Sequence, residues 1–209
     1  MPLTGKLIVF EGGDGTGKTT QALRFLAFLE SVQNAKPLHI REPGSTALGE
    51  KIREILITPC KDPQEEITAE AEMLLYMSCR AQLFKTIIRP ALYKGKTVVL
   101  ERSFYSTYAY QGLGLGLDAE LILLLGRSVS QGIDPYRVIL LDMPVSASLS
   151  RLGSKKDRIE SRDYSFHERV RQGYLQVAGR YPALFKIIDA TGNPEEVEAR
   201  IHAVFNDIL

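Results

Sequence analysis

Short apolar runs alternate along this chain with longer segments in which apolar residues recur at helical spacing. Four of the five short runs are rich in β-branched residues and almost continuously apolar, which is typical of strands covered on both faces. The predicted strands span 6–11, 37–42, 96–101, 137–142 and 185–190. The predicted helices span 17–33, 46–57, 66–93, 118–131, 145–153, 165–181 and 194–208. This alternation predicts a five-stranded parallel sheet in a three-layer α/β fold.

An acidic residue stands at or beside the end of every predicted strand. These residues are Glu11, Glu42, Glu101, Asp142 and Asp189. Ligands bind outside the carboxyl ends of parallel strands, so several of these acids can converge on one crevice. The alternative is that they only solvate strand ends and cap the helices that follow. The pattern by itself leaves both interpretations open.

The length of 209 residues and the ordinary composition indicate one compact domain over residues 1–209. Basic and acidic residues nearly balance, 26 against 25. That balance offers no general attraction for nucleic acid or a membrane, so any affinity for phosphate must be local. Cys60 and Cys79 are too few for a disulfide framework or a zinc site. Since no apolar run approaches the roughly 18 residues of a membrane span, we expect a cytoplasmic enzyme.

Residues 12–19, GGDGTGKT, fit the pattern G-x-x-x-x-G-K-[ST] without a mismatch. The glycines let successive backbone N–H groups turn inward around phosphate, the lysine reaches the terminal phosphates, and the last hydroxyl can bind Mg²⁺. The match follows a predicted strand and opens a predicted helix, whose N-terminal dipole adds to anion binding. The predicted nucleotide-binding residues are Gly12, Gly13, Asp14, Gly15, Thr16, Gly17, Lys18 and Thr19, with Thr19 as the Mg²⁺ ligand.

Other residues that suit base and phosphate binding lie downstream. Tyr76 and Arg80 share one face of a predicted helix and could hold a flat base, although core packing also explains such a pair. Arg102 follows the third strand and is expected to point into the crevice. The segment RLGSKKDRIE contains four cations: Arg151, Lys155, Lys156 and Arg158. Its polar, glycine-broken sequence predicts a mobile flap over about 151–163 that closes over a transferring phosphate; a solvated surface is the alternative.

Several of these motifs occur together in one order. They are the phosphate loop, REPG, LLY…CRAQ, ERS…AYQG, DRIE and IDATGNPEEV. In this order and spacing the chain resembles the bacterial-type thymidylate kinases over nearly its whole length. The resemblance implies a P-loop nucleoside monophosphate kinase fold. It also implies the reaction ATP + dTMP ⇌ ADP + dTDP, with Mg²⁺, in a protein that is usually a homodimer.

The resemblance further implies roles for individual residues. The phosphate loop holds ATP, Arg102 grips the dTMP phosphate with help from Arg53, and Tyr76 stands where the family often has a phenylalanine stacked on thymine. The remaining acceptor residues address the base edge. The implied dTMP-binding residues are Asp14, Arg53, Tyr76, Arg80, Arg102, Ser106, Thr107 and Gln111. The implied catalytic residues are Lys18, Glu101, Arg102, Arg151 and Arg158, the last two as flap cations facing the transferred phosphoryl group.

A carboxylate at Asp14 is unexpected in a loop that binds anions. The variable positions of this loop contain no arginine, and a carboxylate facing ATP would repel it. We therefore expect Asp14 to face away from ATP. The resemblance implies that it accepts a hydrogen bond from the 3′-hydroxyl group of the acceptor.

Two departures from the family pattern keep an alternative open. Glu101 and Arg102 stand where the family typically has Asp-Arg, and Ser45 replaces the second glycine of EPGG. Glu-Arg-Ser is also how deoxynucleoside kinases read at this place, where the glutamate is the base towards a 5′-hydroxyl. The alternative function is therefore phosphorylation of thymidine, although REPG, AYQG and DRIE favour the monophosphate kinase. A non-kinase GTPase switch is disfavoured, because SKKD at 154–157 lies in a polar loop rather than at a strand end.

Overall fold

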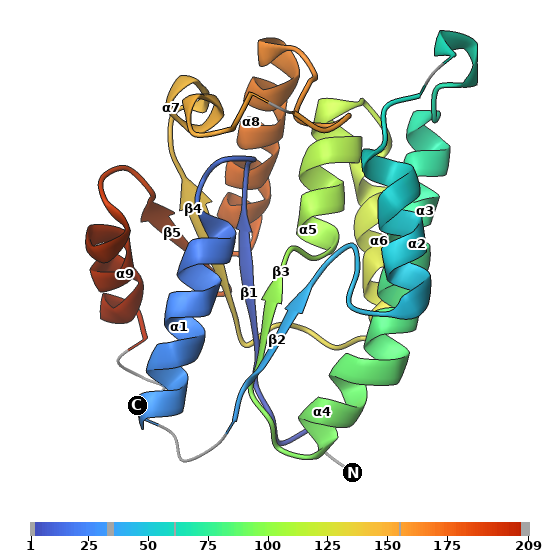
Figure 1. The fold of residues 1–209 in the computed structure, drawn as a ribbon. Coiled ribbons are helices and arrows are strands. Elements are labelled where there is room, and N and C mark those ends of the chain that lie inside the picture. Colours follow the sequence, from blue (N-terminus) through green and yellow to red (C-terminus); the bar gives the residue numbers. More distant parts are fainter. Residues whose placement is uncertain (1–2, 33–35, 61, 155, 206–209) are drawn as a thin grey trace.

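The computed structural model describes residues 3–32, 36–60, 62–154 and 156–205. At its centre lies a parallel sheet in the order β2-β3-β1-β4-β5 (Figure 1). The strands are β1 (Leu7–Gly12), β2 (Leu38–Arg41), β3 (Val98–Glu101), β4 (Arg137–Asp142) and β5 (Phe185–Asp189). The five-stranded parallel sheet predicted from the apolar runs is confirmed, with strand ends that shift by two residues at most.

Helices cover both faces of this sheet, and α1 and α9 lie together on one of them (Figure 1). The helices are α1 (Lys18–Val32), α2 (Ala47–Ile57), α3 (Ala69–Leu83), α4 (Arg89–Tyr93), α5 (Phe104–Thr107), α6 (Ala119–Val129), α7 (Val145–Ser150), α8 (Tyr164–Arg180) and α9 (Pro194–Ala203). Three short segments of the described chain are helices of another type: η1 (Pro63–Glu65) is a 3₁₀-helix, and η2 (Phe84–Ile88) and η3 (Tyr108–Gly114) are π-helices. The predicted helical positions 33 and 206–208 lie outside the described residues.

Alternation along the central strand divides the core in two. Ile8 and Phe10 face α1 and α9, where Phe10 packs on Phe25 with ring centroids 5.7 Å apart. Leu7 and Val9 face the opposite layer and join its larger core. Both faces of β1 are buried, as a strand with period-2 side chains between two helical layers requires.

Side-chain caps set the start of most long helices. In each case an oxygen accepts a hydrogen bond from a backbone N–H of the first turn, which has no partner inside the helix. The capping residues are Thr46 for α2, Thr68 for α3, Asp118 for α6, Asp163 for α8 and Asn193 for α9. Such residues before an apolar periodic run are readable from sequence, and the predicted helix starts lie within three residues of the observed ones.

The helix predicted over 66–93 is divided in the structure. It comprises α3, the wider turn η2, and α4. Pro90 lies at the start of α4 and has no N–H to donate to the preceding turn. A wider turn at η2 accommodates such a break in the hydrogen-bond ladder, so the chain continues in nearly the same direction.

The helical segment α5–η3 was not predicted from the sequence. Most of its residues, FYSTYAYQGLG, are aromatic, β-branched or glycine, which have low helix propensity. The helix begins because Glu11 lies at its N-terminus: the Glu11 carboxylate accepts hydrogen bonds from the backbone N–H groups of Ser103 (2.7 Å) and Ser106 (3.3 Å). It also accepts from both serine hydroxyls and from Tyr174. Glu11 is thus a fully buried helix cap that does not line the crevice, so the crevice interpretation is corrected for this acid, while Glu42 and Glu101 do line it.

The phosphate loop depends on two glycines that no other residue could replace without strain. Gly15 has φ +77°, and a Cβ atom there would lie 2.0 Å from the Ser148 carbonyl oxygen. Gly12 has φ +145°, and its Cβ would lie 2.6 Å from the Leu141 carbonyl oxygen. The loop therefore passes directly over the end of β4 and against Ser148 of α7, where it presents its backbone to the crevice.

Replacing the buried cap tests its place in the fold. Glu11→Ala leaves two backbone N–H groups and three hydroxyls without their buried acceptor, so we expect the free energy of unfolding to fall by about 3 kcal/mol or more. Urea unfolding followed by circular dichroism measures this loss. The exposed Glu30→Ala on α1 serves as control and should change stability by no more than about 0.5 kcal/mol. Equal stability of the two variants would contradict this assignment.

Candidate active site

A cavity of about 340 Å³ opens at the carboxyl ends of β1, β2 and β3. Its walls come from the phosphate loop, the REPG turn, α2, α3, α5–η3 and the flap. The predicted site residues that line it are Asp14, Gly15, Gly17, Lys18, Thr19, Arg53, Tyr76, Glu101, Arg102, Ser106, Thr107 and Gln111. The structure therefore brings the predicted donor and acceptor sides into one continuous space.

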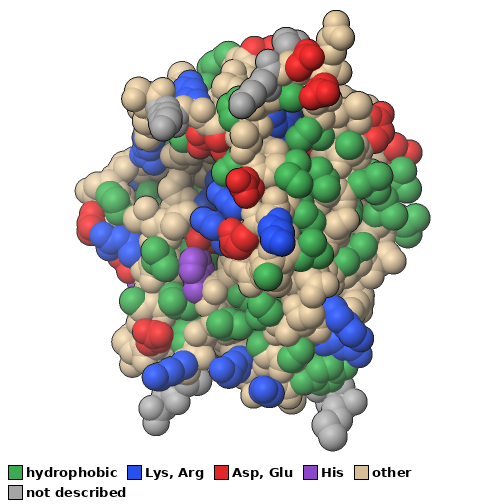
Figure 2. Space-filling model, turned by 45° about the vertical axis from the view of Figure 1, so that its right-hand side comes forward, with side chains coloured by type: hydrophobic (Ala, Val, Ile, Leu, Met, Phe, Trp, Pro, Cys, Tyr) green, Lys and Arg blue, Asp and Glu red, His purple; other side chains and the backbone are tan. Residues whose placement is uncertain are grey.

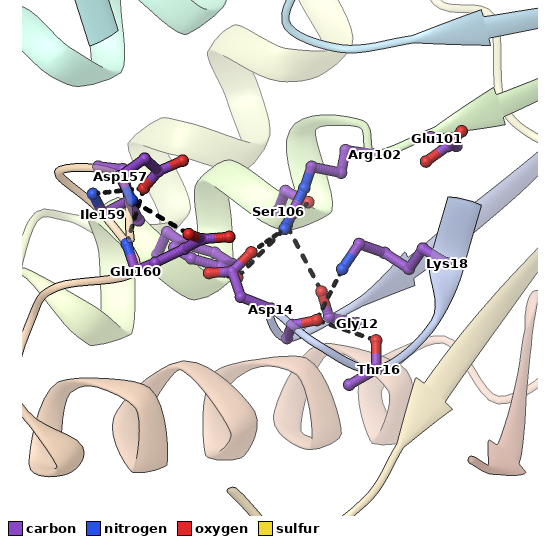
Figure 3. A network of polar contacts seen from close by, with 12 residues as sticks. Gly12, Asp14, Thr16, Lys18, Glu101, Arg102, Ser106, Asp157, Ile159 and Glu160 are labelled. Carbon is purple, nitrogen blue, oxygen red and sulfur yellow. Dashed lines mark hydrogen bonds and ion pairs between the residues drawn. The ribbon is translucent and has the colours of Figure 1, made fainter. Parts of the chain in front are cut away.

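Arg102 lies between these two sides. Its backbone has φ +66°, a left-handed conformation that is strained for a non-glycine residue, and its N–H donates to the Phe10 carbonyl at 2.9 Å. This turn directly after β3 sends the guanidinium towards the phosphate loop, where it forms an ion pair with Asp14 (Figure 3). The cation also lies over the Tyr110 ring, 5.1 Å from its centroid. Arg102 is thereby aimed at the junction of the two substrate regions.

Asp14 turns to the acceptor side of the cavity. Besides its ion pair with Arg102, it accepts a hydrogen bond from the Tyr110 hydroxyl at 2.7 Å. Burial by itself raises the pKa of Asp14, but the charges of Arg102 and Lys18 and the Tyr110 hydrogen bond outweigh it and hold the pKa below its ordinary value. Asp14 is therefore a stable carboxylate that can only accept hydrogen bonds.

Lys18 is folded back onto the loop that it follows. Its Nζ donates to the Gly13 carbonyl at 2.6 Å, and the side chain is buried (Figure 3). Burial lowers the pKa of Lys18 to about 7, and repulsion from Arg102 adds to this shift, while Asp14 and the nearby glutamates oppose it. A buried cation with so little compensating charge favours the approach of an anion, as a phosphate-binding lysine should.

Glu101 is buried at the end of β3, with both carboxylate oxygens engaged. The Thr19 hydroxyl donates to Oε2 at 2.6 Å, and His39 on β2 lies 2.7 Å from Oε1 through its Nε2 atom. Sequence reasoning missed His39. The sequence offered only a weak signal, because His39 is a polar residue inside a short predicted strand, two positions before Arg41. Only the pairing of β2 with β3 places it beside Glu101.

The residues around Thr19 fit a magnesium ion. Thr19 and Glu101 present oxygen donors, the ligand type that Mg²⁺ prefers. In the described ranges there is no group of three or more histidine, cysteine or acidic side chains that could hold a metal ion. That agrees with Mg²⁺ chemistry, because this ion is normally held by one or two protein oxygens together with substrate phosphates and water.

The acceptor wall is held by hydrogen bonds that reach deep into the fold. Arg80 is buried behind the cavity: its Nε donates to Glu42 at 2.9 Å, and its terminal nitrogens lie 3.3 Å from the Thr107 hydroxyl. Gln111 donates to Glu72 at 2.7 Å. Arg80 does not line the cavity, so the expectation that its guanidinium addresses a base edge is corrected: it supports Thr107, which does line the cavity.

The flap arginines are not where the sequence placed them. Arg158 is buried; its Nη2 donates to Glu72 at 2.5 Å and its Nε to the Leu56 carbonyl at 2.8 Å. Arg151 instead donates to the carbonyl oxygens of Ala190 and Gly192, both at 3.2 Å. The expectation that both cations face the cavity is therefore corrected, because neither lines it. The physical reason for Arg158 is that Glu72 is completely buried and requires cationic partners, here together with Arg162 at 2.9 Å.

Other residues of the flap form the part of the cavity wall that the two arginines do not. Lys156 is exposed, and Lys155 lies outside the described residues. The flap residues that do line the cavity are Asp157, Ile159 and Glu160 (Figure 3). The turn that they form is tied together by Asp157, whose Oδ1 accepts from the backbone N–H groups of Ile159 and Glu160, each at 2.8 Å.

Comparison with known proteins agrees with this arrangement. The family model described as thymidylate kinase matches residues 10–201. The chain belongs to the thymidylate kinase family. It is 40% identical to a thymidylate kinase of Deinococcus radiodurans over 205 residues, covering 97% of each protein. It is 42% identical to one of Pelotomaculum thermopropionicum, covering 99% of this chain and 95% of the relative.

A solved structure of the thymidylate kinase family supports the fold independently. The crystal structure of thymidylate kinase from Ehrlichia chaffeensis superposes with a TM-score of 0.77 at 30% identity, covering 97% of this chain and 99% of that one. The resemblance read from the motifs and the P-loop kinase fold that it implied are both confirmed. Among the described residues, no helix is long and apolar enough to cross a membrane.

The lowered pKa of Lys18 predicts how the substrate-free protein responds to pH. Between about pH 7 and 10.5 the unfolded chain retains a proton that folded Lys18 has released, so this group makes the free energy of unfolding rise with pH. Lys18→Met should therefore be more stable than the wild type near pH 7, with a gain that shrinks as pH rises, while kcat falls by about 10²-fold or more. Thermal unfolding from pH 7 to about pH 9 measures the profile. The exposed Lys51→Met is the control, and an identical profile for both variants would contradict the assignment.

Proposed function

We propose that this protein transfers the terminal phosphoryl group of ATP to dTMP and releases ADP and dTDP. Membership of the thymidylate kinase family supports this activity. The observation that carries it in the structure is Arg102, a partly buried cation positioned between the phosphate loop and the acceptor wall of one cavity. A phosphate bound at Arg102 would lie beside the phosphate that Lys18 holds, which is the arrangement that phosphoryl transfer between two nucleotides needs.

The transfer step follows from this arrangement. An ionised phosphate oxygen of dTMP attacks the terminal phosphorus of ATP; a new P–O bond forms, the bond to the bridging oxygen breaks, and ADP leaves with its electrons. The chain contributes position and charge: Lys18 and Arg102 neutralise the phosphate oxygens on either side of the transferred group. The attacking oxygen is already ionised, so no strong base is required.

We assign the donor site to the loop from Gly12 to Thr19. The glycine-rich backbone and the start of α1 offer N–H groups to the ATP phosphates, and Thr19 is the proposed protein ligand of Mg²⁺. When bound, Mg²⁺ would draw charge from the terminal phosphates and hold them in line with the acceptor. The flap cations Arg151 and Arg158 would contribute to catalysis only after leaving their present carbonyl and carboxylate partners.

We assign the acceptor site to the wall opposite the loop. Tyr76 provides a flat face for the base, Arg53 supports Arg102 at the phosphate, and Asp14 accepts the sugar 3′-hydroxyl hydrogen. The base edge is addressed by polar side chains of α5–η3 that line the cavity, with Arg80 fixing one of them from behind. These side chains are Ser106, Thr107 and Gln111.

The alternative acceptor, thymidine, would require Glu101 to act as a base on a 5′-hydroxyl. Both oxygens of Glu101 already accept hydrogen bonds, from Thr19 and from the His39 side. This favours a positioning role for Glu101 at the ATP side of the cavity. The named relatives likewise favour the monophosphate kinase over the thymidine kinase.

We further propose that the enzyme is a homodimer and that residues 1–209 act as one kinase domain in the cytoplasm. Figure 2 shows hydrophobic side chains gathered over the side of the molecule that carries α2, α3 and α6. The exposed apolar residues of these helices are Leu48, Ile55, Leu74, Leu121 and Leu124. A contiguous apolar face of this kind marks an interface more often than a free surface. The exposed free thiol of Cys60 suits a reducing compartment.

The acceptor is tested by coupled ADP release with ATP and Mg²⁺ in the presence of dTMP, thymidine, dUMP, dCMP, dGMP or AMP. We expect turnover with dTMP and none with thymidine, because Arg102 would be left without a phosphate. Turnover with thymidine but not with dTMP would overturn the proposed function and make Glu101 a general base. Activity with dUMP would measure how much the base pocket depends on the thymine methyl group.

The dimer is tested by light scattering after size exclusion. Leu124 is 67% exposed on α6, and Leu124→Arg should convert the dimer to a monomer at low micromolar concentration, since it places a charge in an apolar contact. Leu23 on α1, 47% exposed in the opposite layer, provides the matched control, and Leu23→Arg should leave the dimer intact. A monomeric wild type, or two variants that dimerise equally, would contradict the proposed interface.

A further inference from the structure

Glu101 is connected to a residue that neither the motifs nor the family name accounts for. Its carboxylate is buried, with Oε1 2.7 Å from His39 Nε2 and Oε2 2.6 Å from the Thr19 hydroxyl. A carboxylate can only accept, so both neighbours donate, and the Nε2 atom of His39 carries a hydrogen. The three side chains form one chain of hydrogen bonds that runs from the sheet edge to the start of α1.

Strand pairing brings His39 to this place. In the parallel register of β2 and β3, Arg41 pairs with Glu101 and His39 pairs with Val99. Side chains two residues apart lie on the same face of a strand, so His39 and Glu101 both face the layer that contains α1. Because β2 is the edge strand, the His39 side chain stays 26% exposed while the Glu101 side chain is only 4% exposed. His39 therefore closes the outer side of the Glu101 pocket.

This geometry determines which way Thr19 can present its oxygen. A hydroxyl has one hydrogen and two acceptor lone pairs. The hydrogen of Thr19 is used on Glu101, so its lone pairs are free to turn towards the cavity that Thr19 lines. That orientation requires Oε2 of Glu101 to stay fixed, and the bond from His39 to the other oxygen fixes it.

Without His39, a second partner would compete for the carboxylate. The charge of Glu101 already acts on Lys18, whose pKa it raises against the effect of burial. A glutamate released on one side could turn towards this cation and leave Thr19 without its acceptor. Both changes would weaken the hold on the nucleotide phosphates and their metal ion, while leaving Arg102 and the acceptor wall in place.

We propose that His39 is a positioning residue for the metal–nucleotide complex: through Glu101 it orients the Thr19 hydroxyl whose oxygen binds the divalent ion. This inference rests on the proposed function. It assigns to His39 an effect on metal and ATP affinity, with little effect on dTMP. Removing a group that orients a metal ligand in this way typically weakens metal binding by about 10- to 100-fold.

The test compares His39→Leu, which removes the donor, with His39→Gln, which keeps an N–H donor. His202→Leu is the matched control, because His202 is also a partly exposed histidine (30%) but belongs to α9, where its ring stacks on Phe28 of α1, and it does not line the cavity. The probe is Mn²⁺ in the presence of ADP, followed by electron paramagnetic resonance, so that the readout does not depend on turnover. Kinetic assays add KM for MgATP and KM for dTMP.

We expect His39→Leu to weaken Mn²⁺ binding by about 10-fold and to raise KM for MgATP, with KM for dTMP within about 2-fold of the wild type. His39→Gln should recover most of the loss, and His202→Leu should match the wild type. Equal binding by His39→Leu and His202→Leu would overturn the proposal. An equal loss in the Leu and Gln variants would overturn it too, because the donated hydrogen bond would then be irrelevant.

A double-mutant cycle makes the test independent of any general loss of stability. If His39 acts through Thr19, His39→Leu should weaken Mn²⁺ binding far less in a Thr19→Ala background than in the wild type. Additive effects would show that the two residues act separately and would overturn the proposal. Failure of the proposed function is recognised differently, as a wild type that binds Mn²⁺ and ADP but does not phosphorylate dTMP.

Discussion

A fully buried carboxylate, Glu11, is the constraint on which the site depends. It ends the central strand and accepts hydrogen bonds from the first turn of α5 and from Tyr174 of α8. A charge with no access to water must be surrounded by donors, and here those donors are the start of the helix that bears the acceptor wall. Arg102, in its left-handed conformation, lies directly before this turn. One buried carboxylate thus holds the start of the helical segment that carries Ser106, Thr107 and Gln111 to the cavity.

Several charged side chains at the cavity have partners within the protein. Arg102 forms an ion pair with Asp14 and lies over the Tyr110 ring, and the Lys18 ammonium group donates a hydrogen bond to the Gly13 carbonyl. On the far wall, buried Glu72 joins α3 to Gln111 and to two flap arginines. These contacts join the phosphate loop to η3, and α3 to η3 and the flap. On the proposed function, a phosphate oxygen would replace the Asp14 carboxylate at Arg102 or the Gly13 carbonyl at Lys18, so that neither cation is left unpaired.

Local patterns were sufficient for most of the fold and for the centre of the site. Apolar runs located all five strands, and the helical spacing of apolar residues located the starts of the long helices to within three residues. The phosphate loop was readable because its chemistry uses contiguous backbone and one lysine. Arg102 was expected in the crevice because it follows the third strand, and Asp14 was expected to face away from ATP because a carboxylate would repel it. Their roles towards the acceptor came from the family resemblance. These features depend on neighbours in sequence, whose geometry is set by the backbone itself.

Tertiary structure alone decided the rest, because it depends on contacts between distant segments. The α5–η3 helix has low intrinsic propensity and exists through Glu11, about 90 residues earlier. The flap carries Arg158 to Glu72 and not to the cavity, since a buried acid outcompetes solvent for a nearby cation. His39 reaches Glu101 only through the register of β2 on β3. The sequence by itself determined the phosphate loop and the layered fold; which charges meet in the cavity was decided by burial, which forces each of them to find a partner wherever the fold places one.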